Sequence, residues 1–249
     1  MKKILIRADD LGYCEAVNYG IARAVRDGIV RCVGVMPNME YAEHGVRLLD
    51  GLDVTFTVHV NISQGRPITD PALIPSLVGP DGEFKDKEVY RSAKEDFVVL
   101  EEVLLEVEAQ YRRLVELIGK KPYMIEIHAV PSANFFKATA IVAQRHGVEY
   151  LHFTPAGELM IGSSRILQSM DSGNADYDPF ESFKRAAAQP LAPDQVPMMI
   201  LHPGYVDQYV CDTSYITLQR AREVAFAIDP KVPAWCREND VQLLTYADL

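Results

Sequence analysis

The sequence predicts an α/β protein in which helices surround a mostly parallel sheet. Three observations support this prediction. Strand-like and helix-like segments alternate almost from end to end, polar residues follow several of the strands, and 249 residues with 48% hydrophobic content can form a large core. At this length a (β/α) barrel, regular or distorted, is the leading architecture, and an open doubly wound sheet is second. We expect residues 1–249 to form a single domain.

The first sixty residues contain three predicted strands and two predicted helices. Residues 3–8 form a short apolar run, residues 32–36 (CVGVM) a second one that Pro37 closes, and residues 54–60 (VTFTVHV) a β-branched strand. Apolar residues recur at helical spacing between residues 15 and 27, and Gly28 supplies a stop. A second helix is expected at residues 41–49.

The alternation stops between residues 61 and 92, where seven Pro and Gly residues interrupt the chain. A loop of this length inside a compact domain is usually functional or disordered, so we interpret it as an excursion that covers a site. The pattern then resumes with a long amphipathic helix, a strand, a helix and a strand, at residues 97–118, 123–129, 135–146 and 148–153.

The C-terminal part continues the same alternation. Residues 156–176 show no clear pattern, and Pro179 follows the expected N-cap Asp178 at the start of a helix. The remaining elements are a helix at Pro179–Ala188, a strand at 196–201 (VPMMIL), helices at 218–227 and Lys231–Glu238, and a strand at 241–246.

Composition excludes several classes of function. The net charge of −10 without a Lys/Arg run argues against a nucleic-acid partner. The N-terminal MKKILIRADD lacks a proper signal-peptide core, and no apolar stretch approaches the length of a membrane span. Four scattered cysteines without a CxxC pair suit a reducing compartment. We therefore expect a cytoplasmic protein with a small-molecule substrate, and a homodimer as the default assembly.

Polar residues that could carry chemistry follow four of the predicted strands. Asp9 and Asp10 follow the first strand, and His59, His128 and His202 stand at the ends of three others. The C-terminal ends of parallel strands face one side of an α/β protein, where active sites lie. These five residues are therefore expected to converge.

Each of these residues also has a purely structural interpretation. Adjacent strand residues point to opposite sides, so Asp9 and Asp10 need not share one role. The structural interpretation is that both acidic side chains favour a helix N-terminus. His59 shares its face with Asn61, which could orient the histidine or a ligand. Alone, His59 would more often be a satisfied core histidine.

His128 and His202 have informative neighbours. Glu126 lies on the same strand face as His128 and could accept a hydrogen bond from an imidazole, a frequent support for metal-bound histidine; otherwise the two are a local polar pair. The Pro-Gly turn after His202 would fix its ring at the strand end.

Two histidines and a carboxylate suit a divalent cation with open coordination positions. Such a cation would polarise a carbonyl and lower the pKa of bound water, and a carboxylate base with a histidine acid would complete a hydrolytic mechanism. The chain has no GxSxG, Walker A or GxGxxG pattern, and Cys14 and Cys211 neither support nor exclude a thiol nucleophile.

The order of these motifs resembles the YdjC-like carbohydrate deacetylases, which include bacterial chitooligosaccharide deacetylases. The similarity spans nearly the whole chain, through RADDLGYCEAVNYGIARA, VHVNISQGRPI, IEIHAVP and ILHPGYVD, an Arg-x-x-Glu helix at Arg220 and Glu223, and a final strand ending LLTYADL. Two positions depart from the family's pattern. Glu126 stands where aspartate is typical, and Val130 where a second histidine is typical.

The resemblance implies a distorted (β/α) barrel that removes acetyl groups from N-acetylated sugars. It implies Asp10, His59 and His128 as ligands of one divalent cation, Mg²⁺ in this family although the ligands would also suit Zn²⁺. It further implies Asp9 as the general base and His202 as the general acid. Asn61 and Arg220 are expected to bind substrate, with positioning of Asp9 as a second role for Arg220.

Two other functions remain open from the sequence. A glycosidase or phospho-sugar cleaving enzyme on the same barrel could use Asp9 and Glu126 as its acid/base pair. A non-catalytic protein could bind an oligosaccharide and a metal ion without turnover.

Overall fold

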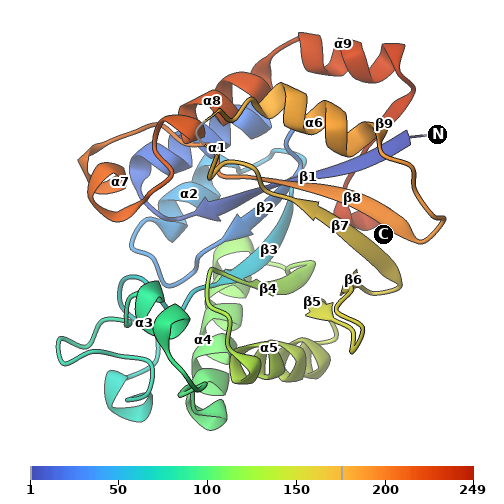
Figure 1. Cartoon of the computed structure of the whole chain (residues 1–249). Helices are drawn as coiled ribbons and strands as arrows, with labels where there is room; N and C mark the ends of the chain where they lie inside the picture. The colour runs from blue at the N-terminus through green and yellow to red at the C-terminus, as the bar shows by residue number, and fades with distance from the viewer. Residues whose placement is uncertain (1, 175) are drawn as a thin grey trace.

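A single sheet organises the part of the chain that the computed structural model describes, residues 2–174 and 176–249. Positions 1 and 175 of the expected domain lie outside the described residues. The strand order is β2-β3-β4-β5-β6-β7-β8-β1-β9, and β2 also pairs with β1, so β1 to β8 close into a barrel (Figure 1). The predicted barrel is therefore confirmed.

The nine strands of the sheet have these bounds: β1 (Lys2–Leu11), β2 (Cys32–Val35), β3 (Thr55–Val60), β4 (Met124–Ile127), β5 (Glu149–Phe153), β6 (Leu159–Ile161), β7 (Ser164–Ser169), β8 (Gln195–Leu201) and β9 (Val241–Leu244). The helices are α1 (Glu15–Arg26), α2 (Ala42–Leu48), α3 (Lys87–Ser92), α4 (Leu100–Ile118), α5 (Ala133–His146), α6 (Pro179–Ala188), α7 (Gln208–Thr213), α8 (Leu218–Ile228) and α9 (Lys231–Glu238), with short 3-10 turns at Pro71–Leu73 and Tyr246–Asp248.

The barrel is distorted by the segment that showed no clear pattern in the sequence. Residues 156–176 contain β6 and β7, and β6 pairs antiparallel with both β5 and β7, whereas the other pairings of the sheet are parallel. β6 has only three residues and four of the six residues of β7 (SRILQS) are polar, so neither offers a detectable period. Helix α7 is also too short to be predicted.

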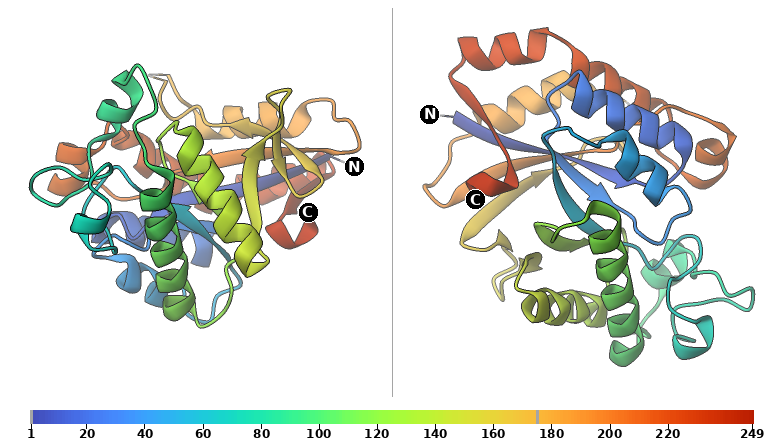
Figure 2. Two further views of the ribbon diagram at one scale, coloured as in Figure 1. Left: turned by 90° about the horizontal axis from the view of Figure 1, so that it is seen from below. Right: turned by 180° about the vertical axis from the view of Figure 1, so that it is seen from behind.

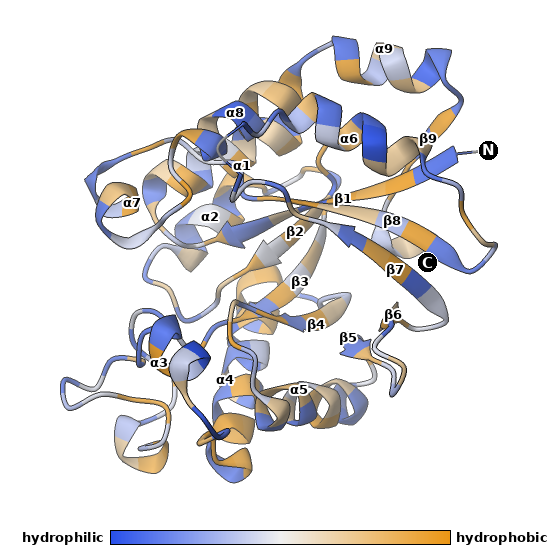
Figure 3. Ribbon diagram, viewed as in Figure 1, coloured by the Kyte–Doolittle hydropathy of each residue, from blue (hydrophilic) through white to orange (hydrophobic). Residues whose placement is uncertain are grey.

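The helices cover the barrel in two groups. In Figure 1, α1, α6, α8 and α9 lie above β1 and β8, and α4 and α5 lie below β3 and β4. The views of Figure 2 agree, with blue α1 and the orange and red C-terminal helices on one side and green α4 on the other. Figure 3 shows hydrophilic and hydrophobic residues on the same helices, as expected when one face packs on a sheet.

Two apolar layers result from this arrangement. The larger one lies between helices and sheet, and α1 contributes its four predicted apolar residues, Val17, Ile21, Ala24 and Val25. The smaller one fills the barrel and contains Leu5, Cys32, Met124, Ile161, Ile166, Val196, Met198 and Ile200. The catalytic candidates lie above this second layer.

The excursion at residues 61–92 is more ordered than a plain loop. It contains the turn Pro71–Leu73 and helix α3, and α4 anchors it through the buried Glu106, which accepts hydrogen bonds from the backbone N–H groups of Ile68 and Thr69. Helix α4 starts three residues later than predicted, at Leu100. Among the described residues, none of the helices combines the length and apolar character that crossing a bilayer requires.

Candidate active site

The five strand-end residues meet in one cavity of about 260 Å³, which we name the strand-end cavity. Asp9 and Asp10 belong to β1 and His59 to β3, while His128 and His202 directly follow β4 and β8. All five line the cavity. Asp9, Asp10, His59 and His202 are buried, and His202, the most exposed of these four, is only 8% exposed. The expected convergence is therefore observed.

Asp9 and Asp10 face the cavity together, which corrects the expectation that they point to opposite sides. The register between β1 and β2 shifts between Ala8 and Leu11, and Asp10 has a φ of 75°. Such an irregularity re-aims side chains near active sites, and aspartate is among the residues that tolerate left-handed backbone. A regular strand would have turned one carboxylate away.

Asp10, His59 and His128 present one side-chain atom each to a common point. Nε2 of His59 lies 2.9 Å from Nδ1 of His128. Oδ1 of Asp10 lies 3.6 Å from the first of these nitrogens and 3.5 Å from the second. Two ligands held about 2.1 Å from one ion at right angles are about 3.0 Å apart, so the three atoms fit a single divalent cation. Oδ1 of Asp10 is buried without a hydrogen-bond partner among the described residues, which supports this fit.

Glu126 supports His59 from the neighbouring strand. The two residues are register partners in the β3–β4 pairing, and Nδ1 of His59 lies 2.6 Å from Oε2 of Glu126. A carboxylate on one imidazole nitrogen fixes the other toward a metal ion. Glu126 thus serves His59 rather than His128, its neighbour on the same strand.

Charges around the two histidines drive their pKa values apart. Burial alone would lower the pKa of His59, but Glu126 and Asp9 outweigh it and raise the value to about 10. Burial lowers the pKa of His128 to about 3 against the attraction of Asp10. A cation at these ligands would displace the proton of His59, so its binding is expected to depend on pH.

A second group of candidate ligands contains Asp9, His59 and Glu126. Arg7 already supplies the positive charge there, because its guanidinium lies 2.6 Å from Asp9 and 3.6 Å from Glu126. The group at Asp10 therefore fits a metal ion better. Oδ2 of Asp9 holds Arg7, and its buried Oδ1 has no partner among the described atoms, so this oxygen can accept a proton.

Helix α8 supports the other side of the site through two buried residues three positions apart. The guanidinium of Arg220 lies 2.8 Å from Oδ2 of Asp10. Burial would raise the pKa of Asp10, but the positive charge of Arg220 outweighs burial and holds this pKa well below its usual range. Glu223 accepts hydrogen bonds from the His202 backbone N–H at 2.6 Å and the Tyr177 hydroxyl at 2.9 Å. Burial raises the pKa of Glu223 to about 7.

His202 is held by the turn that follows it. Gly204 of this turn packs directly on α1, since a Cβ on Gly20 would lie 2.3 Å from the Gly204 Cα. Burial lowers the pKa of His202, although Asp10 and Asp9 oppose the shift. The turn thus fixes the His202 backbone at the cavity, and the lowered pKa means that the ring gives up a proton readily.

Comparisons with known proteins identify the family of this chain. The family model described as YdjC-like protein matches residues 3–238. The chain belongs to the YdjC-like family. A relative named carbohydrate deacetylase 2, from Listeria innocua serovar 6a, is 30% identical over 99% of this chain and 98% of its own length. A relative from Geobacillus stearothermophilus, named carbohydrate deacetylase, is 29% identical over 98% of this chain and 96% of its own.

A solved structure also shares the fold. It comes from Enterococcus faecalis V583, and its name refers to cellobiose-phosphate cleavage. It is 19% identical, covers 99% of this chain and 98% of its own, and superposes with a TM-score of 0.75.

Two positions that are expected to bind substrate make contacts within this YdjC-like chain. Asn61 is fully buried and does not line the strand-end cavity; its side chain bonds Asn38, the Ser63 N–H and the Gln64 carbonyl, which shapes the start of the excursion. Arg220 lines the cavity but contacts Asp10 rather than Asp9. Polarity at a strand end does not separate loop-forming residues from ligand-binding ones, so these internal contacts of Asn61 could not be predicted from the sequence.

The two departures from the family's pattern differ in effect. Val130 is 1% exposed within the core between helices and sheet, so the position that typically holds histidine is closed to the cavity. Glu126 still provides a carboxylate that hydrogen-bonds to Nδ1 of His59. Its extra length is accommodated by Gly34 of β2, where a Cβ would lie 3.0 Å from Oε1 of Glu126.

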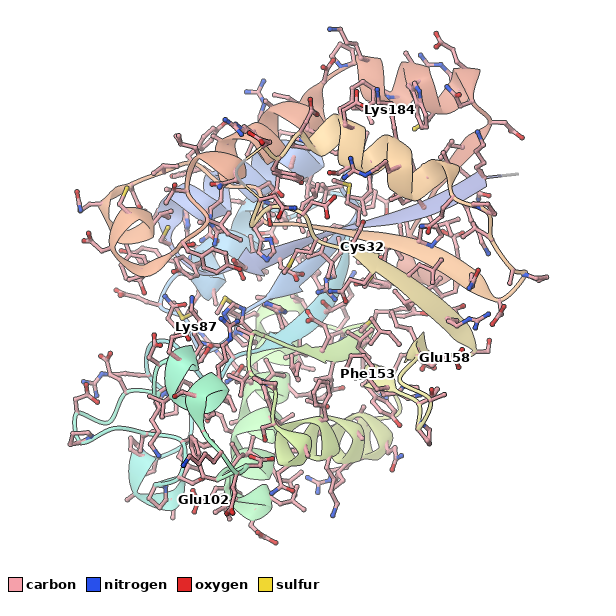
Figure 4. All side chains as sticks on the ribbon, in the orientation of Figure 1. Cys32, Lys87, Glu102, Phe153, Glu158 and Lys184 are labelled. Carbon is pink, nitrogen blue, oxygen red and sulfur yellow. The ribbon has the colours of Figure 1, made fainter. Side chains whose placement is uncertain are left out.

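Sequence reasoning missed several residues that line the cavity mouth. Tyr13 hydrogen-bonds to Gln64 and Thr213 across the mouth, at 2.8 and 2.7 Å. Lys87 and Arg91 reach the cavity from α3, and Figure 4 labels Lys87 there and Phe153 at the end of β5. The segments around Tyr13, Lys87 and Arg91 are not the ends of predicted strands, so the sequence did not mark these residues. Only the interpretation of residues 61–92 as a covering excursion pointed to part of this set.

Proposed function

We propose that this chain is a metal-dependent hydrolase that removes acetyl groups from N-acetylated carbohydrates, with residues 1–249 acting as one deacetylase domain. The observation that carries the proposal is the meeting of Asp10, His59 and His128 beside Asp9 and His202 in one cavity. The names of the two YdjC-like relatives support the reaction and the substrate class.

In this proposal each side chain has a separate task. Asp10, His59 and His128 hold the cation, Glu126 orients His59 through Nδ1, and Arg220 fixes Asp10. A bound divalent cation would polarise the amide carbonyl and lower the pKa of an adjacent water molecule. Mg²⁺ follows from the family resemblance, while two imidazole ligands also suit Zn²⁺.

Proton transfer falls to the two remaining residues. Asp9 takes the proton of the attacking water on Oδ1, while Arg7 keeps Oδ2 in place. His202 gives a proton to the amide nitrogen as the C–N bond breaks, so the products are acetate and the free amine. Glu223 holds the His202 backbone and thereby the position of the ring.

The glycosidase alternative loses its acid/base pair in this geometry. Glu126 is 1% exposed, does not line the strand-end cavity and is engaged by His59. It cannot reach a glycosidic oxygen while Asp9 acts from the other side. The amide hydrolase therefore accounts for more of the site than the glycosidase does.

An acetate-release assay across N-acetylated mono- and oligosaccharides, with chelator and with added Mg²⁺ or Zn²⁺, tests the proposal. We expect His59→Ala to lose bound metal and activity, and His202→Ala to keep the metal while losing rate. His152→Ala is the matched control, because His152 does not line the cavity. Full metal content and activity in His59→Ala would overturn the ligand assignment, and shortened sugars without acetate would overturn deacetylation.

We also propose a cytoplasmic homodimer. All four cysteines are free, and three of them are buried, which suits a reducing compartment. An isologous dimer is the commonest assembly for an enzyme of this kind. Sedimentation analysis tests the dimer, and fractionation of the source cells tests the compartment.

A further inference from the structure

The strand-end cavity has two chemically different sides. Its mouth carries hydrogen-bonding groups from loops and short helices, including Gln64, Lys87, Thr213 and Ser214. The opposite side is built mainly by strands β5 to β8 and is mostly apolar, with Gln168 of β7 as a polar residue among its side chains. We name it the apolar wall, and it consists of Ile127, Leu151, Phe153, Leu159, Met170 and Ile200.

The apolar wall begins beside the proposed catalytic residues and continues to the surface. Ile200 lies two positions before His202, and Ile127 directly precedes His128. At the outer end Phe153 is 56% exposed and Met170 45% exposed, and Phe136 packs edge-on against Phe153. A scattered exposed apolar residue needs no explanation, but several apolar residues that line one cavity from a reaction centre to solvent indicate a ligand.

The two sides suit the two halves of an N-acylated sugar. Sugar hydroxyls need hydrogen-bond partners, which the mouth provides, whereas an acyl chain needs none. A single acetyl methyl group would leave most of the apolar wall uncovered.

We propose that the apolar wall binds the acyl chain of the substrate and that chains longer than acetyl are preferred. The inference rests on the proposed amide hydrolysis and extends its substrate class from acetyl to longer acyl groups. The reaction is balanced by water alone: the water oxygen bonds to the acyl carbon, the C–N bond breaks, and a fatty acid and the free amino sugar leave. The amine carries away the proton that His202 donates.

An acyl series on one sugar tests this proposal. Free amine is measured from N-acetyl-, N-propionyl-, N-butyryl- and N-hexanoylglucosamine with the metal-loaded protein. Burying one methylene should raise kcat/KM about fourfold, so the butyryl compound should be cleaved roughly 15-fold better than the acetyl one. A fall in kcat/KM at propionyl would overturn the proposal. So would a gain for an N-acetylated disaccharide without any gain along the acyl series, since a second sugar ring would then occupy the wall.

Variants at the exposed end localise the effect. Met170→Asp should remove most of the preference for hexanoyl over acetyl, because it places a charge on the chain's path. Leu105→Asp is the matched control, since Leu105 is also about half exposed, at 47%, but lies on α4 away from the cavity. An unchanged hexanoyl-to-acetyl ratio in Met170→Asp would contradict the assignment.

Binding separates failure of the inference from failure of the proposed function. If acetyl compounds are cleaved and longer ones are not, only the inference fails. If no compound releases amine, the proposed function fails, and calorimetry then decides the inference. N-hexanoylglucosamine should bind at least tenfold more tightly than N-acetylglucosamine, and equal affinities would overturn the assignment of the wall.

Discussion

Gly34 offers the sharpest test of how the site is packed. Its position on β2 lies under three residues of the site, and a Cβ there would meet Asp9 Oδ1 at 2.9 Å, Glu126 Oε1 at 3.0 Å and the His59 Cβ at 3.2 Å. These distances are shorter than ordinary van der Waals contact, so Gly34→Ala must displace at least one carboxylate. The backbone at Gly34 is not left-handed, so the effect is one of space alone.

The expected magnitude follows from the size of that displacement. Insertion of a methyl group into a packed site typically lowers the free energy of unfolding by about 1–3 kcal/mol. For a chain of this length each kcal/mol lowers Tm by about 2–4 °C. A misplacement of 1 Å can cost about 10²-fold in rate, so a shift of half that size should lower kcat/KM about tenfold.

The assay measures deacetylation kinetics and thermal unfolding of Gly34→Ala beside two reference proteins. Gly173→Ala is the control, because a Cβ at Gly173 meets none of the described atoms within 4 Å. The second reference protein is the double variant Gly34→Ala/Glu126→Asp, in which the shorter Asp side chain leaves room for the new methyl group. We expect the double variant to be more active than Gly34→Ala alone, and the double-mutant cycle measures this coupling between the two positions. Wild-type activity in Gly34→Ala, or additive losses in the double variant, would refute the reasoning.

The remaining predictions concern α8. Arg220→Met leaves the buried Asp10 carboxylate without its partner and should lower the free energy of unfolding by about 3–5 kcal/mol. Added divalent metal should recover part of this loss. Arg222→Met, a change at an exposed residue of the same helix, should alter the free energy of unfolding little, and equal losses in the two variants would contradict the pairing of Arg220 with Asp10. The pKa of Glu223 is raised from about 4.5 to about 7 in the folded protein. Its contribution to the free energy of unfolding, about 3 kcal/mol, is therefore fully present below pH ~4.5 and is lost as the pH rises to ~7. The stability difference between wild type and Glu223→Gln in urea should therefore shrink by that amount between pH 4.5 and 8, with Glu238→Gln as control, and a constant difference would count against it.

The sequence was sufficient to predict the barrel and the convergence of its strand ends. Those features follow from the alternation of elements and from the rule that parallel strands end on one side. The directions of the Asp9 and Asp10 side chains were harder to predict, because no local sequence pattern apart from the two aspartates marks the irregularity of β1. Partners from distant segments, such as Glu126 for His59 and Arg220 for Asp10, depend on register and on helix packing, which no local pattern contains.

The apolar wall was unpredictable for a related reason. Leu159 and Met170 lie in the segment whose pattern was unclear, and β6 and β7 create the wall only through antiparallel pairing. The chemistry of the strand ends was therefore visible in the sequence, whereas the surface proposed to select the acyl group was not.

Helix α8 joins two parts of the site that would otherwise be independent. Arg220 and Glu223 lie about one turn apart on a rigid element, and one contacts Asp10 while the other holds the backbone of His202. The helix therefore acts as a spacer with a fixed length between the cation-binding side and the proton-donating side. A shift of α8 would move both together, so the distance between them can change only through the loops after β1 and β8.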